Sequence, residues 1–116
     1  MIHIRPLTPL DFLERSAFIF RDKIAVVDGT TRRTYPQFRE RVHRYARALL
    51  GFGLAPGDRV AILCTNSSPL LEVHFAVPLA GGVLCAINTR LKADEIAYIV
   101  GHCGARIFIY DSDFAR

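Results

Sequence analysis

The sequence of 116 residues has few of the residues that hold small secreted or metal-binding proteins together. It contains no tryptophan, and its three cysteines, Cys64, Cys85 and Cys103, are odd in number and form no CxxC pair. A disulfide framework and a cysteine-based zinc site are therefore not indicated, and we expect buried, reduced thiols. The four histidines have no HxxxH or HxxEH spacing, so no metal-ligating residue is assigned.

The sequence also lacks an apolar run long enough to cross a membrane. The longest stretch without a charged side chain, Val73 to Thr89, has 17 residues and is interrupted by Pro78 and by the pair Gly81-Gly82. A membrane-spanning helix needs about 20 mainly apolar residues. The N-terminus has neither the apolar core nor the cleavage site of a secretory signal. We therefore expect no membrane span and a cytoplasmic location.

Several signatures of known chemistry are missing. No GxGxxG, GxxxxGK[ST], GxSxG or HExxH motif occurs, which excludes the usual dinucleotide, triphosphate, serine-hydrolase and metalloprotease interpretations. The acidic residues show no paired-carboxylate spacing. No catalytic residue is therefore assigned.

What the sequence does contain is a regular alternation of apolar segments and turn residues. With 51% hydrophobic and 22% charged residues, it fits one globular α/β domain. From Arg59 onwards the pattern β-α-β-α-β predicts a partial parallel sheet with right-handed helical crossovers, preceded by a helix, an N-terminal β-hairpin and an amphipathic helix. The expected elements are helix 9–20, strands 24–28 and 32–35, helix 36–52, strand 59–64, helix 69–80, strand 83–87, helix 93–103 and strand 106–110.

Ligands of parallel sheets gather outside the carboxyl ends of the strands, which here places three loops together. These are TNSS, NTRL and DSDF, at residues 65–68, 88–91 and 111–114. The first loop precedes a helix whose free N–H groups could hold an anion, although simple capping by Ser67 or Ser68 explains the same letters. In DGTTRRT, residues 28–34, a phosphate loop is the alternative to a hairpin turn, and the hairpin is favoured because Gly29 turns a strand back on itself.

The net charge of +4 is moderate, and much of the excess lies in RRTYPQFRERVHRYAR, residues 32–47, most of which belongs to helix 36–52. An apolar stripe from Phe38 to Leu49 opposes a polar face with Glu40 and Arg44, an i, i+4 pair. That face is either a solvated surface or a phosphate-binding one. A nucleic-acid-binding function is the weakest alternative, since no stacking aromatic residues accompany the arginines; its candidate contacts are Arg39, Arg41, Arg44 and Arg47.

Five segments of the sequence, in their order and spacing, carry a resemblance to a known protein family. They are TPLDFLERSAFIFRDKIAVVDG, RTYPQFRERVHRYARAL, GLAPGDRVAIL, NSSPLLEVHFAVPLAGGVLCAINTRL and DEIAYIVGHCGARIFI. From about Thr8 to Asp111, this set resembles the start of the AMP-forming acyl-CoA synthetases in the adenylate-forming ligase superfamily. The resemblance implies that residues 1–116 are the N-terminal part of an AMP-binding large domain, without a second domain.

The resemblance also implies a reaction for the complete enzyme. Such an enzyme uses ATP and magnesium to convert a small carboxylic acid to an acyl-adenylate, releases pyrophosphate, and transfers the acyl group to coenzyme A. The family's Ser/Thr/Gly-rich phosphate loop, ribose-binding aspartate and C-terminal catalytic lysine are not in this sequence, so we expect the fragment itself to be inactive. Among the residues present, only Arg90 is assigned, to a phosphate of coenzyme A, and Asn88 is expected to fix its loop.

Two departures and one alternative accompany this assignment. Ala86 stands where many relatives have proline, and Lys92 stands where threonine or serine commonly caps the next helix. The alternative is a stand-alone, truncated relative that works as a self-associating or partner-binding module. Because a sheet of three strands leaves an open edge, we expect a homo-oligomer that pairs through that edge.

Overall fold

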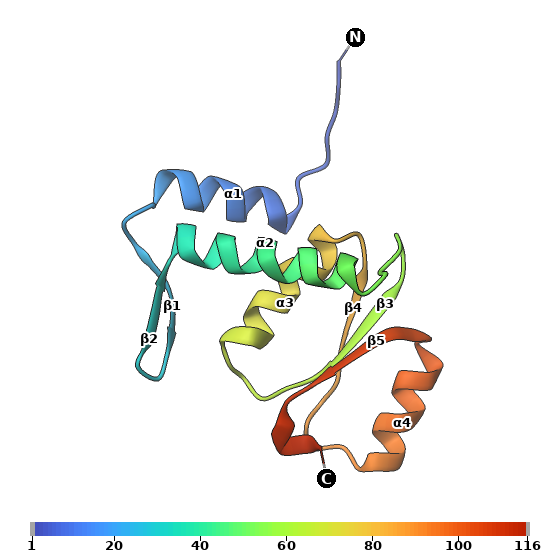
Figure 1. Ribbon diagram of the computed structural model, residues 1–116. Helices are drawn as coiled ribbons and strands as arrows, with labels where there is room; N and C mark the ends of the chain where they lie inside the picture. Colours follow the sequence, from blue (N-terminus) through green and yellow to red (C-terminus); the bar gives the residue numbers. More distant parts are fainter. Residues whose placement is uncertain (1, 116) are drawn as a thin grey trace.

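The elements follow one another in the order that the sequence predicts. A computed structural model of the chain describes residues 2–115 and shows an α/β fold with one antiparallel and one parallel sheet (Figure 1). The elements are α1 (Pro9–Ile19), β1 (Ile24–Asp28), β2 (Thr31–Thr34), α2 (Tyr35–Gly51), β3 (Arg59–Leu63), α3 (Ser68–Leu79), β4 (Val83–Ala86), α4 (Ala93–His102), β5 (Ala105–Tyr110) and the 3₁₀ helix η1 (Ser112–Phe114).

The parallel sheet has the strand order β4-β3-β5. Arg59 at the start of β3 pairs with Val83 on one side and with Ala105 on the other. The central strand is buried on both faces, as expected for a strand between two helical layers. The side chains of β3 alternate between two hydrophobic cores. Val60 and Ile62 pack toward α2 and α3, whereas Ala61 and Leu63 pack toward α4. The two crossover helices α3 and α4 therefore cover opposite faces.

The hairpin is confirmed, and a phosphate loop is not formed at residues 28–34. Asp28 pairs with Thr31 across a turn in which Gly29 has φ +57°, a conformation that glycine adopts without a steric cost. The second strand ends at Thr34, one residue before the predicted end, because Thr34 begins α2. Its hydroxyl accepts the N–H of Gln37, and the Gln37 side chain accepts the N–H of Thr34, which is a capping box.

The first residue of α4 follows Lys92, which holds the N-cap position of this helix. The Lys92 N–H donates to Glu95 Oε2 at 2.8 Å, but an ammonium group cannot accept the free N–H of Glu95. Only half of the capping box is therefore present. Lys92→Ser supplies the missing acceptor and should raise the free energy of unfolding by about 1 kcal/mol in urea titrations. Lys92→Ala is the control, and an equal gain with alanine would contradict the capping explanation.

The helices α1 and α2 are joined by Glu14, which accepts hydrogen bonds from Arg39 Nε and His43 Nε2. Partial burial raises the pKa of Glu14, but these two hydrogen bonds and the Arg39 charge outweigh it and lower the pKa below its ordinary value of 4.5. The folded state is therefore favoured above pH 4.5, and this contribution is lost as the pH falls through the lower, folded pKa.

Glu14→Gln should accordingly lower the melting temperature at pH 6, and this difference should shrink as the pH falls through the lowered folded pKa of Glu14. Thermal unfolding monitored by circular dichroism at several pH values measures the difference. Glu40→Gln, an exposed position on α2, is the matched control and should show no such pH-dependent difference. A difference that persists at low pH would show that Glu14 acts through packing instead of charge.

Candidate functional site

The carboxyl ends of β3 and β4 open into a cleft of about 530 Å³. The loops that follow the two strands form its walls, so the structure places two of the three predicted loops side by side. The lining residues are Cys64, Thr65, Asn66, Leu70, Ala86, Ile87, Asn88, Thr89 and Arg90. This is the edge at which parallel sheets hold their ligands, and the cleft is the candidate functional site.

Arg90 lies in the wall of this cleft, on the loop after β4. Its backbone N–H donates to Asn88 Oδ1 at 3.0 Å, and the Leu91 N–H donates to the Asn88 carbonyl at 3.3 Å. Asn88 thus fixes the loop, as expected. The Arg90 side chain is exposed, and within residues 2–115 it forms no ion pair. Its guanidinium is therefore available to an anion that enters the cleft.

The third loop, after β5, lines a neighbouring cleft of about 340 Å³. Asp111 contributes from this loop, and Cys64 lines both clefts. The Asp111 carboxylate accepts the N–H of Asp113 and so begins the short helix η1. The carboxyl ends of all three strands therefore meet in one region, and the third loop is held by its own backbone contacts.

The N-terminus of α3 lies beside the cleft, but one of its donors is already used. The Ser68 N–H donates to Asp28 Oδ2 at 2.8 Å, so a carboxylate from the hairpin occupies the place of an anion. Ser67 holds the N-cap position, yet its hydroxyl donates to the Thr65 carbonyl and does not cap the helix. The N-terminus of α3 is therefore capped, as predicted, but the acceptor is Asp28 of the hairpin and not Ser67 or Ser68.

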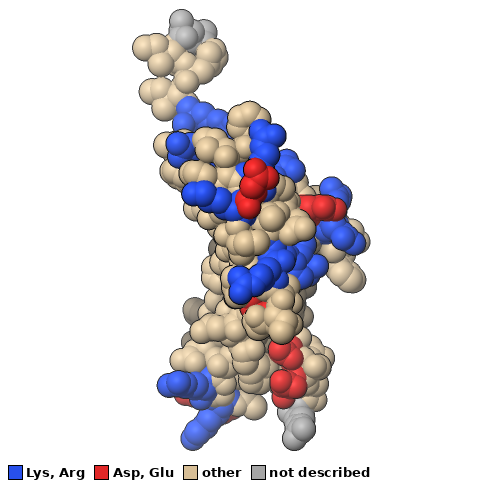
Figure 2. All heavy atoms as spheres, turned by 90° about the vertical axis from the view of Figure 1, so that its left-hand side faces the viewer, with Lys and Arg blue, Asp and Glu red and all other residues tan. Residues whose placement is uncertain are grey.

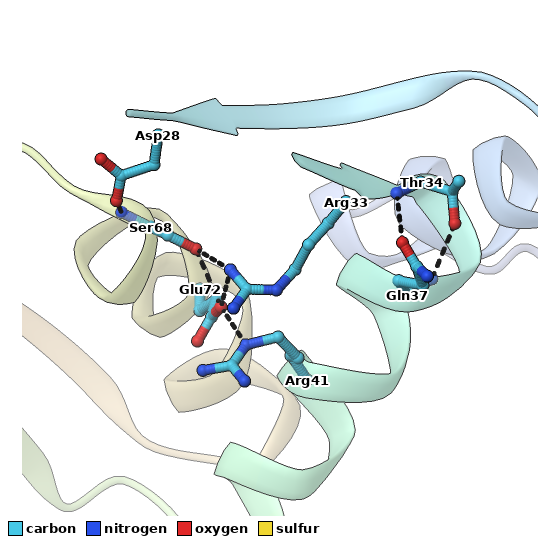
Figure 3. A network of polar contacts seen from close by, with 7 residues as sticks. All are labelled: Asp28, Arg33, Thr34, Gln37, Arg41, Ser68 and Glu72. Atoms are coloured by element: carbon cyan, nitrogen blue, oxygen red, sulfur yellow. Dashed lines mark hydrogen bonds and ion pairs between the residues drawn. The ribbon is translucent and has the colours of Figure 1, made fainter. Parts of the chain in front are cut away.

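A polar network that the sequence analysis did not predict fixes this helix to the hairpin and to α2 (Figure 3). Glu72 is 1% exposed, and its Oε1 accepts from Arg41 Nε at 2.6 Å and from Ser68 Oγ at 3.0 Å. Arg33 Nη1 donates to Ser68 Oγ at 2.7 Å and lies 3.7 Å from Glu72 Oε1. A single acidic residue in the apolar segment 68–80 was the signal that could have indicated a buried partner. The network positions the loop that forms one wall of the cleft.

Fewer arginines on the polar face of α2 are available to a ligand than the sequence suggests. Arg39 pairs with Glu14 and Arg41 pairs with Glu72. Within residues 2–115, Arg44 and Arg47 form no ion pair, and the expected Glu40–Arg44 pair is not formed. Figure 2 shows basic side chains interspersed with acidic ones over the face that carries α1 and the hairpin. Two of the four arginines of α2 thus join this helix to α1 and α3.

The cysteines are free thiols, but the structure corrects their expected burial, since all three are only half-buried. Cys64 and Cys103 directly follow β3 and α4, and Cys85 lies inside the edge strand β4. Burial raises the pKa of the Cys85 thiol, and a hydrogen bond with Cys103 raises it further. Cys85 is therefore mostly protonated at neutral pH and is a weak nucleophile.

Comparison with known protein families identifies the chain. The AMP-binding enzyme family matches residues 13–115, which is nearly the whole sequence. The chain belongs to the AMP-binding enzyme family. The resemblance noted in the sequence and the expected α/β fold are both confirmed by this match.

The most similar family members include several acyl-CoA ligases. A peroxisomal benzoate–CoA ligase of Arabidopsis thaliana is 40% identical over 109 residues, covering 94% of this chain and 19% of the relative. The 4-hydroxybutyrate–CoA ligase 2 of Metallosphaera sedula is 42% identical over 108 residues, covering 93% and 20%. The structure of a fatty acyl CoA synthetase of Mycobacterium tuberculosis matches with a TM-score of 0.85 at 32% identity, covering 89% of this chain and 21% of that one.

The chain thus spans about a fifth of the length of the curated relatives that it matches. Within the part of the chain that the structure describes, no helix is both long and apolar enough to cross a membrane. Residues 2–115 also hold no group of three histidine, cysteine, aspartate or glutamate side chains suited to a metal ion. The side chains of the candidate cleft fit a phosphate group better than they fit a divalent cation.

Proposed function

We propose that this chain is the N-terminal part of the large domain of an AMP-forming acyl-CoA synthetase. The complete enzyme would join a small fatty or aromatic carboxylic acid to coenzyme A at the expense of ATP. The family match over residues 13–115 and the acyl-CoA ligases among the relatives support this proposal. ATP, magnesium and coenzyme A would be bound mainly by parts of the enzyme outside this sequence.

Arg90 is the residue of this chain that we assign to the ligand, as a contact to a phosphate of coenzyme A. The observation that carries the assignment is its position: an exposed guanidinium in the wall of a 530 Å³ cleft, on a loop fixed by Asn88. A planar guanidinium can donate two parallel hydrogen bonds to one phosphate. Because Asn88 holds the loop before a ligand arrives, less entropy is lost on binding.

This role makes Arg90 a binding residue and not a catalytic one. Coenzyme A enters only in the second half-reaction, after the acyl-adenylate has formed. Loss of Arg90 should therefore weaken the thiol-transfer step and leave adenylation unchanged. The difference between the two half-reactions provides the test.

A chimera makes that test possible. The matched 109 residues of the Arabidopsis benzoate–CoA ligase would be replaced by the corresponding part of this chain. In the chimera, Arg90→Ala should raise the KM for coenzyme A about tenfold, equal to the loss of one charged phosphate contact. Benzoate-dependent pyrophosphate exchange should stay within about twofold of the parent chimera.

Lys92→Ala is the matched control, since Lys92 is an exposed cation two residues away on the same loop. An equal rise in KM with both variants would show that the effect comes from positive charge near the cleft and not from a specific contact. It would overturn the assignment of Arg90. The unfused chain should show no pyrophosphate exchange, because it lacks the family's phosphate loop. Exchange by the unfused chain would contradict the proposal that it is an inactive fragment.

A further inference from the structure

Cys85 and Cys103 bring two thiol groups together at a place that does not line the candidate cleft. The two residues are 18 positions apart in the sequence, one in the edge strand β4 and one directly after α4. Their side chains share a hydrogen bond, and both are free, half-buried thiols. The third cysteine, Cys64, shares its hydrogen bond with Ser67 Oγ at 3.4 Å. The fold thus brings together one of the three possible pairs of cysteines.

The register of the parallel sheet explains why these two residues meet. Cys85 pairs with Ala61 of β3, and its side chain packs against the hydrophobic core on the α4 side of the sheet. Arg59 lies two residues before Ala61, and its Nε donates to the Cys103 carbonyl at 2.7 Å. Residues two apart on a strand face the same side of a sheet. Cys85 and the end of α4 are therefore held over neighbouring positions of one face.

The backbone of both residues is fixed, so the two thiols stay close to each other. Cys85 belongs to the ladder of hydrogen bonds between β3 and β4, and the Cys103 N–H donates to the Ile99 carbonyl at 2.9 Å. The Cys103 thiol itself makes only a 3.5 Å contact to the Val100 carbonyl. A thiol is a weak donor, so little is lost when this sulfur forms a covalent bond instead. Groups that a fold holds next to each other react far more readily than free ones.

A metal site is the other use that proteins make of adjacent thiols. A structural zinc ion needs four ligands, whereas residues 2–115 hold no group of three side chains suited to a metal ion. A disulfide needs only two sulfur atoms that can approach to about 2.05 Å. The pair therefore fits a disulfide better than it fits a metal ion.

The helix next to this pair is only weakly held on the sheet. No residue of Ala93–His102 is fully buried, and an apolar groove of about 640 Å³ lies between α4 and β5. Segments with few buried contacts open by local unfolding more often than the core does. A bond between Cys85 and Cys103 would close a ring that contains all of α4 and the Arg90 loop. Because ring closure lowers the entropy of the opened state, α4 should then open less often.

We propose that Cys85 and Cys103 are a redox modification site, at which glutathione disulfide converts the two thiols to a reversible disulfide bond. One protein thiolate attacks glutathione disulfide, forms a mixed disulfide and releases one glutathione thiolate. The second protein thiolate attacks the protein sulfur of the mixed disulfide and releases the second glutathione thiolate. The two protein sulfur atoms lose two electrons, and the two released thiolates take up the two protons. The proposal does not depend on the proposed enzymatic function.

Mass spectrometry of the wild-type chain tests the proposal without any substitution. The chain is equilibrated with reduced and oxidised glutathione, its remaining thiols are alkylated, and it is cleaved after glutamate. Cleavage after Glu40, Glu72 and Glu95 places the three cysteines on separate peptides, 41–72, 73–95 and 96–116. We expect the last two peptides to be joined at least about tenfold more often than either other pair. In about 8 M urea this preference should fall to within about threefold, because loop length alone then decides the pairing.

Hydrogen exchange measures what the bond does to the fold. In the bridged chain the amides of α4 should exchange about tenfold more slowly than in the reduced chain, and a reducing agent should restore the original rates. The amides of α1 are the internal control and should stay within about twofold. Cys64→Ser is the matched variant and should keep both the bond and the slower exchange, whereas Cys103→Ser should lose both.

The proposal is overturned if glutathione adds to Cys85 and Cys103 separately without joining them. A bond that includes Cys64, or one that joins two copies of the chain, would also overturn it. A preference for the same pair that persists in urea would show that the fold is not its cause. Unchanged exchange of α4 in the bridged chain would contradict the effect assigned to ring closure.

Discussion

Replacing Glu72 by alanine is expected to lower the free energy of unfolding by about 3 kcal/mol. The Glu72 carboxylate is almost completely buried and accepts hydrogen bonds from Arg41 and Ser68. Its loss leaves the Ser68 hydroxyl and Arg41 Nε without their acceptor, and it removes the carboxylate that lies 3.7 Å from Arg33 Nη1. Arg33 keeps only 22% of its side chain exposed, so water cannot fully replace the missing partner. The variant also leaves a cavity between α2 and α3.

Urea unfolding followed by circular dichroism measures this effect, with Arg44→Ala as the matched control. Arg44 lies on the same helix as Arg41 but is exposed and, within residues 2–115, forms no ion pair, so its loss should cost less than about 0.5 kcal/mol. Arg41→Ala should fall between the two, because Glu72 then keeps Ser68 and Arg33. Equal stabilities of the Glu72 and Arg44 variants would show that the network contributes no net stability.

Two glycine substitutions should change stability in opposite directions. At Gly82 an added Cβ would lie 3.0 Å from Leu54 Cδ2, 3.1 Å from Val77 Cγ1 and 3.1 Å from the Asp58 carbonyl oxygen. The side chains of Leu54 and Val77 are buried, and the Asp58 carbonyl already accepts the Val83 N–H. None of the three can move freely, so Gly82→Ala should cost about 2 kcal/mol.

Gly101 gives the opposite expectation. It lies inside α4, and a Cβ there would meet no atom within 4 Å. Gly101→Ala should therefore raise the free energy of unfolding by up to about 1 kcal/mol, the difference in helix propensity. Thermal and urea unfolding of both variants compare the two sites directly. A stabilising Gly82→Ala would show that the turn between α3 and β4 is loosely packed.

The neighbouring glycines Gly81 and Gly82 show which features of the fold local sequence patterns can predict. The sequence predicts that a helix stops near Ala80, and Gly81 does take the left-handed conformation, with φ +86°, that ends it. Gly82 has no such conformation and is needed because α3, β4 and the loop before β3 approach one another there. The residues next to Gly82 in the sequence do not predict this close approach, because Leu54 and Asp58 are distant in the sequence.

The same distinction applies to the candidate site. The cluster of three loops was predictable, because the carboxyl ends of parallel strands meet at one edge whatever the side chains are. The fixing of Arg90 by Asn88 was predictable too, since the contact spans two residues. The cap of α3 by Asp28 joins residues 40 positions apart, and the bond from Arg41 to Glu72 joins residues 31 positions apart. Their partners depend on how the hairpin docks on the helices. Whether the chain self-associates stays a prediction.

Sequence alone determined the elements, their order, the α/β class and the family, because hydrophobic periodicity, turn residues and ordered short segments are local properties of the chain. Tertiary structure alone decided which charges are paired, which faces are left uncovered and where the sheet stays open. Those properties depend on contacts between distant residues and on crossover handedness. Local sequence patterns therefore predict the cleft at Arg90, whereas only the tertiary structure shows the apolar groove between α4 and β5.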